Sequence, residues 1–255
     1  MAFTTTILSF AIGAFWGSFF YTLALRFADG SMKKNPLRAL FSRSHCPSCG
    51  AAINPLFLIP FVGYVILRGK CRNCSAVISP LYPVMEILYG AMALLFLWKF
   101  GITPYTFNLY MLASIAACIS LVDIKALIVP NSLVIAFIFL SAYPVLLNYS
   151  IKDNLFGMLL LLVVFLTIIL IFPGSFGGGD VKFGAAIGLF SGLELAIVVL
   201  EISLVSGAVI GILYALIRKK TLKTKIPFAP FLALGLIVSM LYGREILLLY
   251  YRILY

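Results

Sequence analysis

Eight apolar stretches take up most of this chain of 255 residues. They cover residues 4–25, 80–99, 105–123, 131–148, 154–173, 183–192, 194–217 and 227–243. A membrane-spanning helix needs about 20 predominantly apolar residues, and only 183–192 falls clearly short of that length. Hydrophobic residues make up 63% of the chain and charged residues 11%, whereas soluble domains are roughly half apolar and about a quarter charged. The sequence therefore predicts an all-α integral membrane protein with about eight transmembrane helices.

One polar segment, residues 26–79, separates a first transmembrane helix at 1–25 from a second membrane domain at 80–255. Basic residues of short loops stay preferentially on the cytoplasmic side of a membrane. If 26–79 is cytoplasmic and every stretch crosses, fifteen Lys and Arg residues fall on the cytoplasmic side and four on the other. This bias requires that 183–192 crosses, because otherwise the basic residues at 218–225 would lie outside. Both termini are then outside.

The formal charge of +11 does not indicate nucleic acid. The basic residues lie in loops between apolar stretches, where they orient helices and bind anionic lipid headgroups. The sequence has no basic patch that comes with aromatic stacking residues. We therefore expect a lipid bilayer as a partner and no nucleic acid.

Two of the eight acidic residues stand out. The topology places Asp123 at the cytoplasmic end of the third stretch and Asp180 at the cytoplasmic start of the sixth. Two carboxylates at close range cannot both ionise easily, so one keeps its proton and the pair can activate a water molecule. That water can attack a peptide carbonyl while the protonated partner stabilises the oxyanion. Asp123 and Asp180 are therefore the candidate catalytic residues of a membrane aspartic peptidase.

The residues next to both aspartates fit this interpretation. Asp180 follows three glycines at 177–179, which leave its approach free of side chains and allow backbone angles that other residues resist. Each aspartate is followed two residues later by a lysine, Lys125 and Lys182. The alternative is that both acids cap helices at the membrane interface, with a glycine-rich turn between spans. Spacing alone does not choose between these two explanations.

Other acids also lie in or beside apolar stretches. An ionisable group at membrane depth is costly and is usually functional or paired. Glu86, Glu194 and Glu201 belong to this group, and Glu86 is expected either to be paired structurally or to lie near the active site. The remaining acids, Asp153 among them, lie in loops or at span ends and need no functional explanation.

The segment 26–79 contains two C-x2-C pairs, formed by Cys46, Cys49, Cys71 and Cys74. Four thiolates at such spacing suit tetrahedral zinc, although the 21 residues between the pairs slightly exceed the usual zinc-ribbon range. Disulfides or unused cysteines are the alternative, and a cytoplasmic placement argues against disulfides. We therefore predict a small cytoplasmic zinc-ribbon-like insert, beside which the single histidine, His45, is incidental.

Other chemistries lack the residues they need. The sequence has no second set of metal ligands, no phosphate-binding loop and no G-x-G-x-x-G dinucleotide motif. A Ser/His pair is also missing, because the only histidine belongs to the cysteine segment.

Several groups of residues follow one another in an informative order. They are Gly17-Ser18-Phe19 with Arg26; Ser42-Arg43-Ser44 with the cysteine pairs, Ile59-Pro60 and Gly69; Ile78-Ser79 with Tyr82-Pro83 and Glu86; Asp123 with Val129-Pro130; and Gly177-Gly178-Gly179-Asp180-Val181-Lys182. In this order, and on the cytoplasmic side of the predicted topology, they resemble the motifs of the type IV prepilin peptidases (leader peptidase/N-methyltransferases) almost from end to end.

The resemblance implies two activities. One is cleavage of a short basic leader from prepilin or pseudopilin substrates, after a glycine, by Asp123 and Asp180. The other is N-methylation of the new N-terminal residue, commonly phenylalanine, with S-adenosylmethionine, for which the sequence shows no binding site. Residues 80–255 would then be a membrane peptidase domain, and the protein would be a multi-pass protein of the bacterial inner (cytoplasmic) membrane.

Two positions depart from the family pattern. The family usually has asparagine at the position of Tyr21 and often has aspartate at that of Asn131. Because the N-terminal part is associated with methyl transfer, one alternative is a monofunctional leader peptidase without that activity. Two others are a non-catalytic zinc-containing membrane scaffold and a transporter that uses Glu86, Glu194 and Glu201 as an intramembrane relay.

Overall fold

The computed structural model describes four segments of the chain, residues 3–147, 150–172, 177–218 and 226–254. These segments are largely helical and contain no β-strand, only two isolated bridges, between His45 and Ala52 and between Lys70 and Val77. The predicted all-α fold class is confirmed. The chain divides into two compact units, Met1–Thr106 and Phe107–Tyr255.

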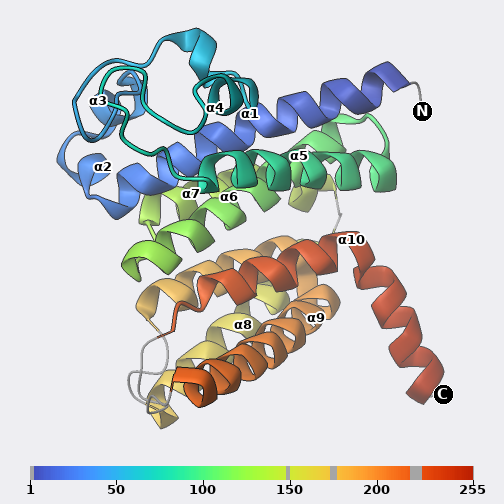
Figure 1. Ribbon diagram of the computed structural model, residues 1–255. Coiled ribbons are helices and arrows are strands. Elements are labelled where there is room, and N and C mark those ends of the chain that lie inside the picture. Colours follow the sequence, from blue (N-terminus) through green and yellow to red (C-terminus); the bar gives the residue numbers. More distant parts are fainter. Residues whose placement is uncertain (1–2, 148–149, 173–176, 219–225, 255) are drawn as a thin grey trace. The chain divides into compact units, whose positions relative to one another are not determined.

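Unit 1 is built on two long helices, α1 (Phe3–Ala28) and α5 (Leu81–Phe100), which lie side by side (Figure 1). Their backbones approach closely because small residues face each other, and a Cβ atom on Gly13 would lie only 2.8 Å from the Cα atom of Gly90. Small residues at helix contacts are typical of membrane proteins. Between the two helices the chain forms four short elements, α2 (Ser31–Lys34), α3 (Pro36–Phe41), η1 (Pro55–Leu58) and α4 (Val62–Ile66).

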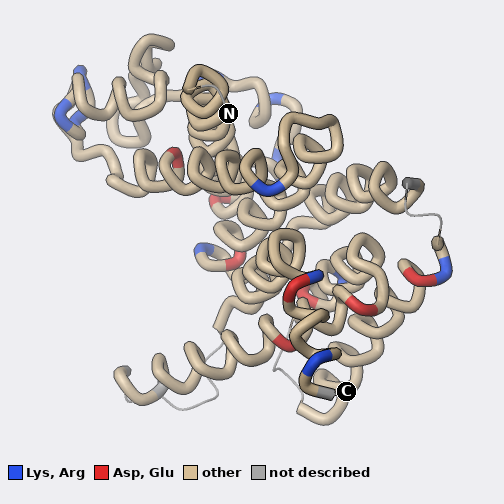
Figure 2. Tube along the Cα trace, turned by 90° about the vertical axis from the view of Figure 1, so that its right-hand side faces the viewer, with Lys and Arg blue, Asp and Glu red and all other residues tan. Residues whose placement is uncertain are grey.

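Unit 2 holds the remaining helices and has an aromatic core. Phe137 and Phe183 meet edge to face with ring centroids 5.9 Å apart, and the Phe165 and Phe228 rings lie 5.7 Å apart. Figure 2 shows that the long helices carry few charged residues along their length. The helices are α6 (Pro104–Ala126), α7 (Asn131–Leu147), α8 (Ile151–Ile171), α9 (Gly178–Arg218) and α10 (Ala229–Leu254).

Helix α9 reverses direction at Gly192, which has the positive φ of 72° that favours glycine. A straight helix of 41 residues would be about 60 Å long, so its two ends could not meet. Yet the start of α9 touches Val129, because a Cβ atom on Gly179 would lie 2.7 Å from the Cβ atom of Val129. Gly207, in the second half of α9, lies against Phe228, the residue directly before α10. The backbone N–H of the next residue, Ala229, donates a hydrogen bond to Asp123 in the last turn of α6. Both ends of α9 therefore lie at the same end of unit 2, and α9 consists of two antiparallel halves.

Two side chains of α8 hold this reversal. The amide nitrogen of Asn154 donates to the carbonyl oxygen of Leu189 at 2.8 Å, in the last turn before the break. The Asp153 carboxylate accepts from the backbone N–H of Leu193 at 3.2 Å, directly after the break. A carboxylate is favourable at a helix N-terminus, where backbone N–H groups lack partners within the helix. Asp153, for which the sequence suggested no role, thus caps the second half of α9.

Among the described residues, six helices are long and apolar enough to cross a membrane, and Asn131–Leu146 is a shorter apolar helix. Counting the two halves of α9 separately, the described helices correspond to the eight predicted stretches. The eight crossings themselves stay a prediction. Residues 148 and 173, at the ends of two predicted stretches, and the basic residues at 219–225 lie outside the described part of the chain.

The last helix is longer than predicted. The apolar stretch ends at residue 243, before Arg244 and Glu245, whereas α10 continues to Leu254. Charges end a run of apolar residues without ending a helix, because long side chains can carry their charged groups to water. Figure 1 shows the C-terminal part of α10 bent away from its first part.

Candidate functional site

Asp123 and Asp180 come together at one end of unit 2. Asp123 lies in the last turn of α6 and Asp180 in the first turn of α9. Both are buried, with 5% and 7% of their surface exposed. The connection that follows α6 touches α9 directly before Asp180, since a Cβ atom on Gly179 would lie 2.7 Å from the Cβ atom of Val129. The structure thus pairs the two acids that the sequence singled out, 57 residues apart.

The Asp123 carboxylate is held by the start of α10. Its Oδ2 accepts a hydrogen bond from the backbone N–H of Ala229 at 3.0 Å. One turn earlier in α6, the Ser120 hydroxyl lies 3.2 Å from the carbonyl oxygen of the same Ala229. These two contacts fix the first turn of α10 against α6, so they also fix the orientation of the Asp123 side chain.

The Asp180 carboxylate has one fixed oxygen and one oxygen without a partner. Its Oδ2 accepts from the backbone N–H of Gly177 at 2.9 Å. Its Oδ1 is buried and has no hydrogen-bond partner among the described residues. Most buried polar atoms have a partner, so Oδ1 is the atom that is free to bind a water molecule or a substrate group.

The glycines before Asp180 differ in their surroundings. A Cβ atom on Gly178 would meet no described residue within 4 Å, whereas one on Gly179 would strike Val129. Gly179 therefore allows α9 to begin directly against the connection between α6 and α7, and no described residue fills the space next to Gly178. At the start of α7, Asn131 accepts a hydrogen bond from the exposed Lys182 ammonium group at 3.4 Å.

The backbone of Ala229 is the functional group that the sequence did not reveal. A backbone N–H exists at every residue except proline, so residues 226–230 carry no side-chain signal of their contact with Asp123. Only the fold shows that the start of α10 belongs to this site.

The four cysteines of unit 1 converge on one point. Their Sγ atoms all lie within 4.8 Å of one another, and the Sγ atoms of Cys46 and Cys74 are 3.8 Å apart. Zn–S bonds of about 2.3 Å in a tetrahedron place sulfur atoms about 3.8 Å apart. The four residues therefore fit a tetrahedral metal ion.

Two similar loops shape this metal centre. The N–H of Cys46 bonds to the carbonyl of Ala51 at 2.9 Å, and the N–H of Cys71 bonds to the carbonyl of Ala76 at 2.8 Å, five residues further on in each loop. Backbone N–H groups of Cys49 and Ser48 lower the pKa of the Cys46 thiol to about 6. Those of Cys74 and Asn73 likewise lower the pKa of Cys71. Thiolates are the form that binds metal, so these backbone N–H groups favour the metal-binding form of Cys46 and Cys71.

The other membrane acids have their own partners. Glu86 Oε2 accepts from the backbone N–H of Phe61 at 2.9 Å. Glu201 and Glu194 accept from the hydroxyl groups of Tyr250, at 2.5 Å, and Tyr251, at 3.3 Å. These contacts pair each acid with a neighbour in its own unit.

Two family models match the chain. The model described as Bacterial Peptidase A24 N-terminal domain matches residues 11–100, which include the four cysteines. The model described as Type IV leader peptidase family matches residues 109–212, which include Asp123 and Asp180. The boundary between the matched segments falls next to the boundary between the two structural units.

Curated relatives match along most of the chain. A protein of Bacillus subtilis (strain 168) with the name prepilin leader peptidase/N-methyltransferase is 30% identical over 248 residues, which cover 95% of this chain and 96% of that protein. Relatives with the same name from Legionella pneumophila and Pseudomonas aeruginosa are 31% and 29% identical over 84% of this chain, and over 77% and 76% of their own length. No solved structure matches the chain.

Proposed function

The chain belongs to the type IV leader peptidase family, and we propose that Asp123 and Asp180 cleave the leader of its prepilin substrates. The observation that carries this proposal is the pairing of two buried carboxylates, one of which keeps a buried oxygen without a partner. A carboxylate that served only as a structural cap would leave this buried oxygen unsatisfied, whereas most buried polar atoms have a partner. The pairing therefore favours catalysis over the helix-capping alternative.

The proposed chemistry follows from how each carboxylate is held. One member of the pair is protonated and the other is ionised, because two close carboxylates repel each other. The ionised carboxylate takes a proton from a water molecule, which attacks the scissile carbonyl. The protonated carboxylate donates its proton to the carbonyl oxygen. The Ala229 N–H keeps Asp123 oriented, while Oδ1 of Asp180 is free to face the water.

The substrate would reach this pair past Gly178. The space next to Gly178, which no described residue fills, supports entry of an extended peptide segment. In the predicted topology this end of unit 2 faces the cytoplasm, where a short basic leader is presented before the rest of the substrate is exported. We accordingly place the protein in the bacterial inner membrane, with prepilin or pseudopilin substrates.

The second activity is N-methylation, in agreement with the name N-methyltransferase of the relatives, and the family resemblance implies that the new N-terminal residue accepts the methyl group. S-adenosylmethionine is the methyl donor that this activity uses, and we assign no residue to its binding. One observation supports the alternative of a monofunctional leader peptidase. Tyr21 is buried and packs edge-on against Tyr82, with ring centroids 4.8 Å apart, at the position where the family usually has asparagine.

We also propose that the metal at the four cysteines is zinc. The convergence of four thiols within 4.8 Å and the all-cysteine donor set both suit Zn²⁺. The ion would hold the two loops of the insert together and would take no part in peptide hydrolysis, since four thiolates leave a tetrahedral ion no open position.

The proposed catalytic role of the two aspartates is tested by replacing each of them in the full-length protein. Asp123→Asn and Asp180→Asn should each lower leader cleavage at least about a hundredfold, because asparagine cannot exchange the proton. Cleavage is measured in membranes by the size shift of a prepilin with a basic leader. Glu201→Gln, which replaces another acid of unit 2 and keeps an acceptor for Tyr250, should cleave at the normal rate.

A second readout separates loss of chemistry from loss of folding. The two Asn variants should still transfer a labelled methyl group from S-adenosylmethionine to a substrate that is already cleaved. Near-normal cleavage by either Asn variant would show that the aspartates are not the catalytic pair. If the unaltered protein cleaves but transfers no methyl group, the monofunctional alternative holds.

A further inference from the structure

An apolar segment interrupts the polar insert of unit 1. Residues 55–67 contain no Lys, Arg, Asp or Glu, and they form η1 and α4. Several of their large side chains are exposed, with 66% of Leu56, 70% of Val65 and 60% of Ile66 accessible. Apolar runs of this length are typical of buried helices or of re-entrant and interfacial membrane segments. These side chains are exposed, so a buried helix is excluded.

Contacts with α1 and α5 show how deep the segment reaches. Helix α5 has 20 residues, so its length of about 30 Å matches the hydrocarbon thickness of a bilayer. Glu86, which binds the N–H of Phe61, lies about 8 Å along α5 from Leu81. The Phe61 ring also stacks on Phe10, with centroids 6.1 Å apart. Phe10 in turn touches Gly90, which lies about 13 Å along α5 from Leu81.

Several backbone N–H groups of the segment have hydrogen-bond partners. Unsatisfied backbone groups are costly at membrane depth, and non-helical backbone is tolerated there only where protein or water covers it. Phe61, at the turn between η1 and α4, donates its N–H to Glu86, and Gly63 and Leu67 donate theirs to Ile59 and Gly63 at 3.0 Å. Gly63 permits the tight turn, because a Cβ atom there would lie 1.9 Å from the carbonyl oxygen of Phe57. The segment is therefore a compact hairpin.

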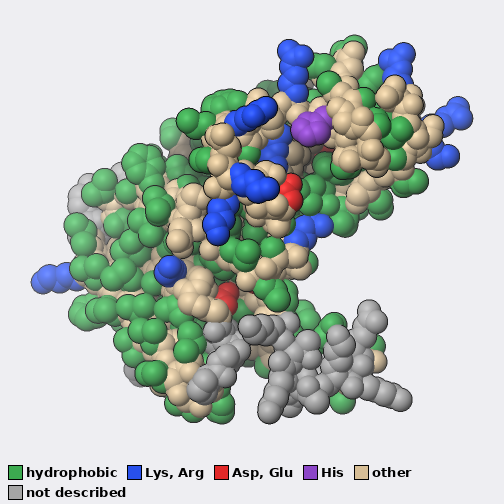
Figure 3. Space-filling view, turned by 90° about the vertical axis from the view of Figure 1, so that its left-hand side faces the viewer, with side chains coloured by type: hydrophobic (Ala, Val, Ile, Leu, Met, Phe, Trp, Pro, Cys, Tyr) green, Lys and Arg blue, Asp and Glu red, His purple; other side chains and the backbone are tan. Residues whose placement is uncertain are grey.

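The charges around the hairpin suit phospholipid headgroups. Residues 30–85 contain seven Lys and Arg residues and no Asp or Glu, and Figure 3 shows basic side chains around the single histidine. Arg68, Lys70 and Arg72 follow the hairpin directly. Such a surface attracts anionic lipid, whereas it would repel a basic leader peptide. Lipid is therefore the occupant that complements both the charge and the exposed apolar side chains.

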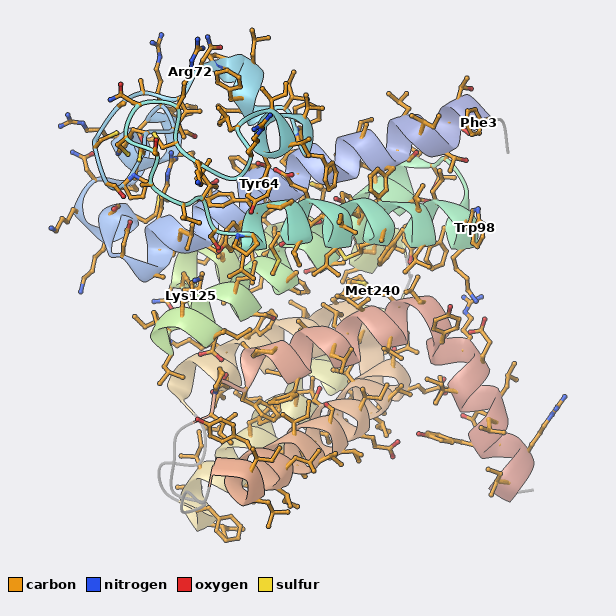
Figure 4. The ribbon with its side chains drawn as sticks, viewed as in Figure 1. Phe3, Tyr64, Arg72, Trp98, Lys125 and Met240 are labelled. Atoms are coloured by element: carbon orange, nitrogen blue, oxygen red, sulfur yellow. The ribbon has the colours of Figure 1, made fainter. Side chains whose placement is uncertain are left out.

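We propose that residues 55–67 form a re-entrant hairpin that lies in the acyl chains of the leaflet on the insert's side of the membrane, beside α1 and α5. Glu86 anchors its turn, and the basic residues that follow bind anionic headgroups. In Figure 4, Tyr64 of α4 lies beside α1 and α5, whereas Arg72 lies farther from them. The hairpin explains why the two cysteine pairs are farther apart than in an ordinary zinc ribbon. This inference does not depend on the peptidase assignment.

Tryptophan quenching by brominated phospholipid tests the depth of the hairpin. The background protein carries Trp16→Phe and Trp98→Phe and is reconstituted into vesicles of anionic phospholipid with bromine on the acyl chains. A tryptophan introduced as Val65→Trp should lose most of its fluorescence relative to vesicles without bromine. Val77→Trp is the matched control, because Val77 is an exposed valine of the same insert, with 79% accessible, but lies in the second cysteine loop. It should keep its fluorescence.

A second tryptophan position controls for a local folding defect caused by the substitution at residue 65. Ile66→Trp, on the next residue of α4, should be quenched in the same way, and metal content should stay normal in all three variants. Quenching of Val65→Trp and Ile66→Trp but not of Val77→Trp supports the hairpin. Absence of quenching at both α4 positions would overturn the hairpin, because the segment would then lie in water. Equal quenching at Val77 would also overturn it, because the whole insert would then contact lipid to the same extent.

Discussion

Glu86 shows how a single acid inside an apolar helix can be satisfied without catalysis. Its carboxylate accepts from the N–H of Phe61 and from the Ser18 hydroxyl, both within unit 1. An acid at membrane depth is by default a functional candidate, and the sequence left Glu86 between structural pairing and a place near the active site. The contacts favour pairing, since they join the insert to the two long helices.

Substitutions of Glu86 should therefore affect stability according to whether an acceptor remains. Glu86→Gln keeps a carbonyl oxygen for the Phe61 N–H and should be mild. Glu86→Ala leaves a buried N–H without a partner and should cost about 1–3 kcal/mol of unfolding free energy. Thermal unfolding of the purified protein in detergent measures the difference. Equal melting temperatures for the two variants would show that the hydrogen bond contributes no stability.

Side chains with their own chemistry are the part of the site that a sequence can predict. Asp123 and Asp180 could be found because acids are rare in this chain and the alternation of spans brings them to one side. The Ala229 N–H that orients Asp123 could not be found, because it has no side-chain signal. Asp153 was set aside as an ordinary acid at a span end, since its partner, the N–H of Leu193, appears only after α9 reverses.

At the scale of elements, the reversal in α9 depends on polar groups supplied by another helix. The carbonyl groups that end one half and the N–H groups that begin the next lose their helical partners at Gly192. Asn154 and Asp153 of α8 replace one partner on each side of the break. The pattern of apolar residues located both halves, but it did not contain the reason why they separate.

The metal centre of the insert leads to a prediction about composition and folding. The purified protein should contain about one zinc per chain, because four thiolates complete a tetrahedral site. Replacing Cys46 and Cys71 together by serine should remove the metal, since each cysteine pair loses one ligand. Cys118→Ser, a substitution of the buried cysteine of α6, should keep it. Metal analysis checks these contents, and free thiols in a metal-free native protein would contradict the assignment.

For the molecule as a whole, hydropathy predicted most of the fold. The predicted stretches agree with the long helices because lipid requires apolar length and internal backbone hydrogen bonds, and both leave a clear mark in the sequence. The same rule leaves residues 55–67 within the polar insert, because this uncharged run is too short to cross. It also ended the last helix too early, at the charges of Arg244 and Glu245.

The topology of the whole chain is the prediction on which the location of the aspartate pair depends. The fifteen-to-four bias of basic residues places the insert on the cytoplasmic side. The reversal at Gly192 brings the start and end of α9 to the same end of unit 2. Each crossing changes sides, so the positions after α6 and after α9 should both face the cytoplasm.

Single cysteines in a cysteine-free background, labelled with a membrane-impermeant maleimide, test this arrangement. Cysteines at Lys125 and Lys219 should react only in inverted membrane vesicles, and those at Lys99 and Lys152 only from the outside of intact cells. A cysteine at Ser42 serves as the control, since it shows whether the insert stays on the cytoplasmic side once its metal ligands are removed. A straight α9 that crosses once would carry Lys219 to the outside, while Lys125 stays in the cytoplasm. Labelling of these two positions from opposite sides would therefore rule out the two-span form of α9 and, with it, the eight-helix topology.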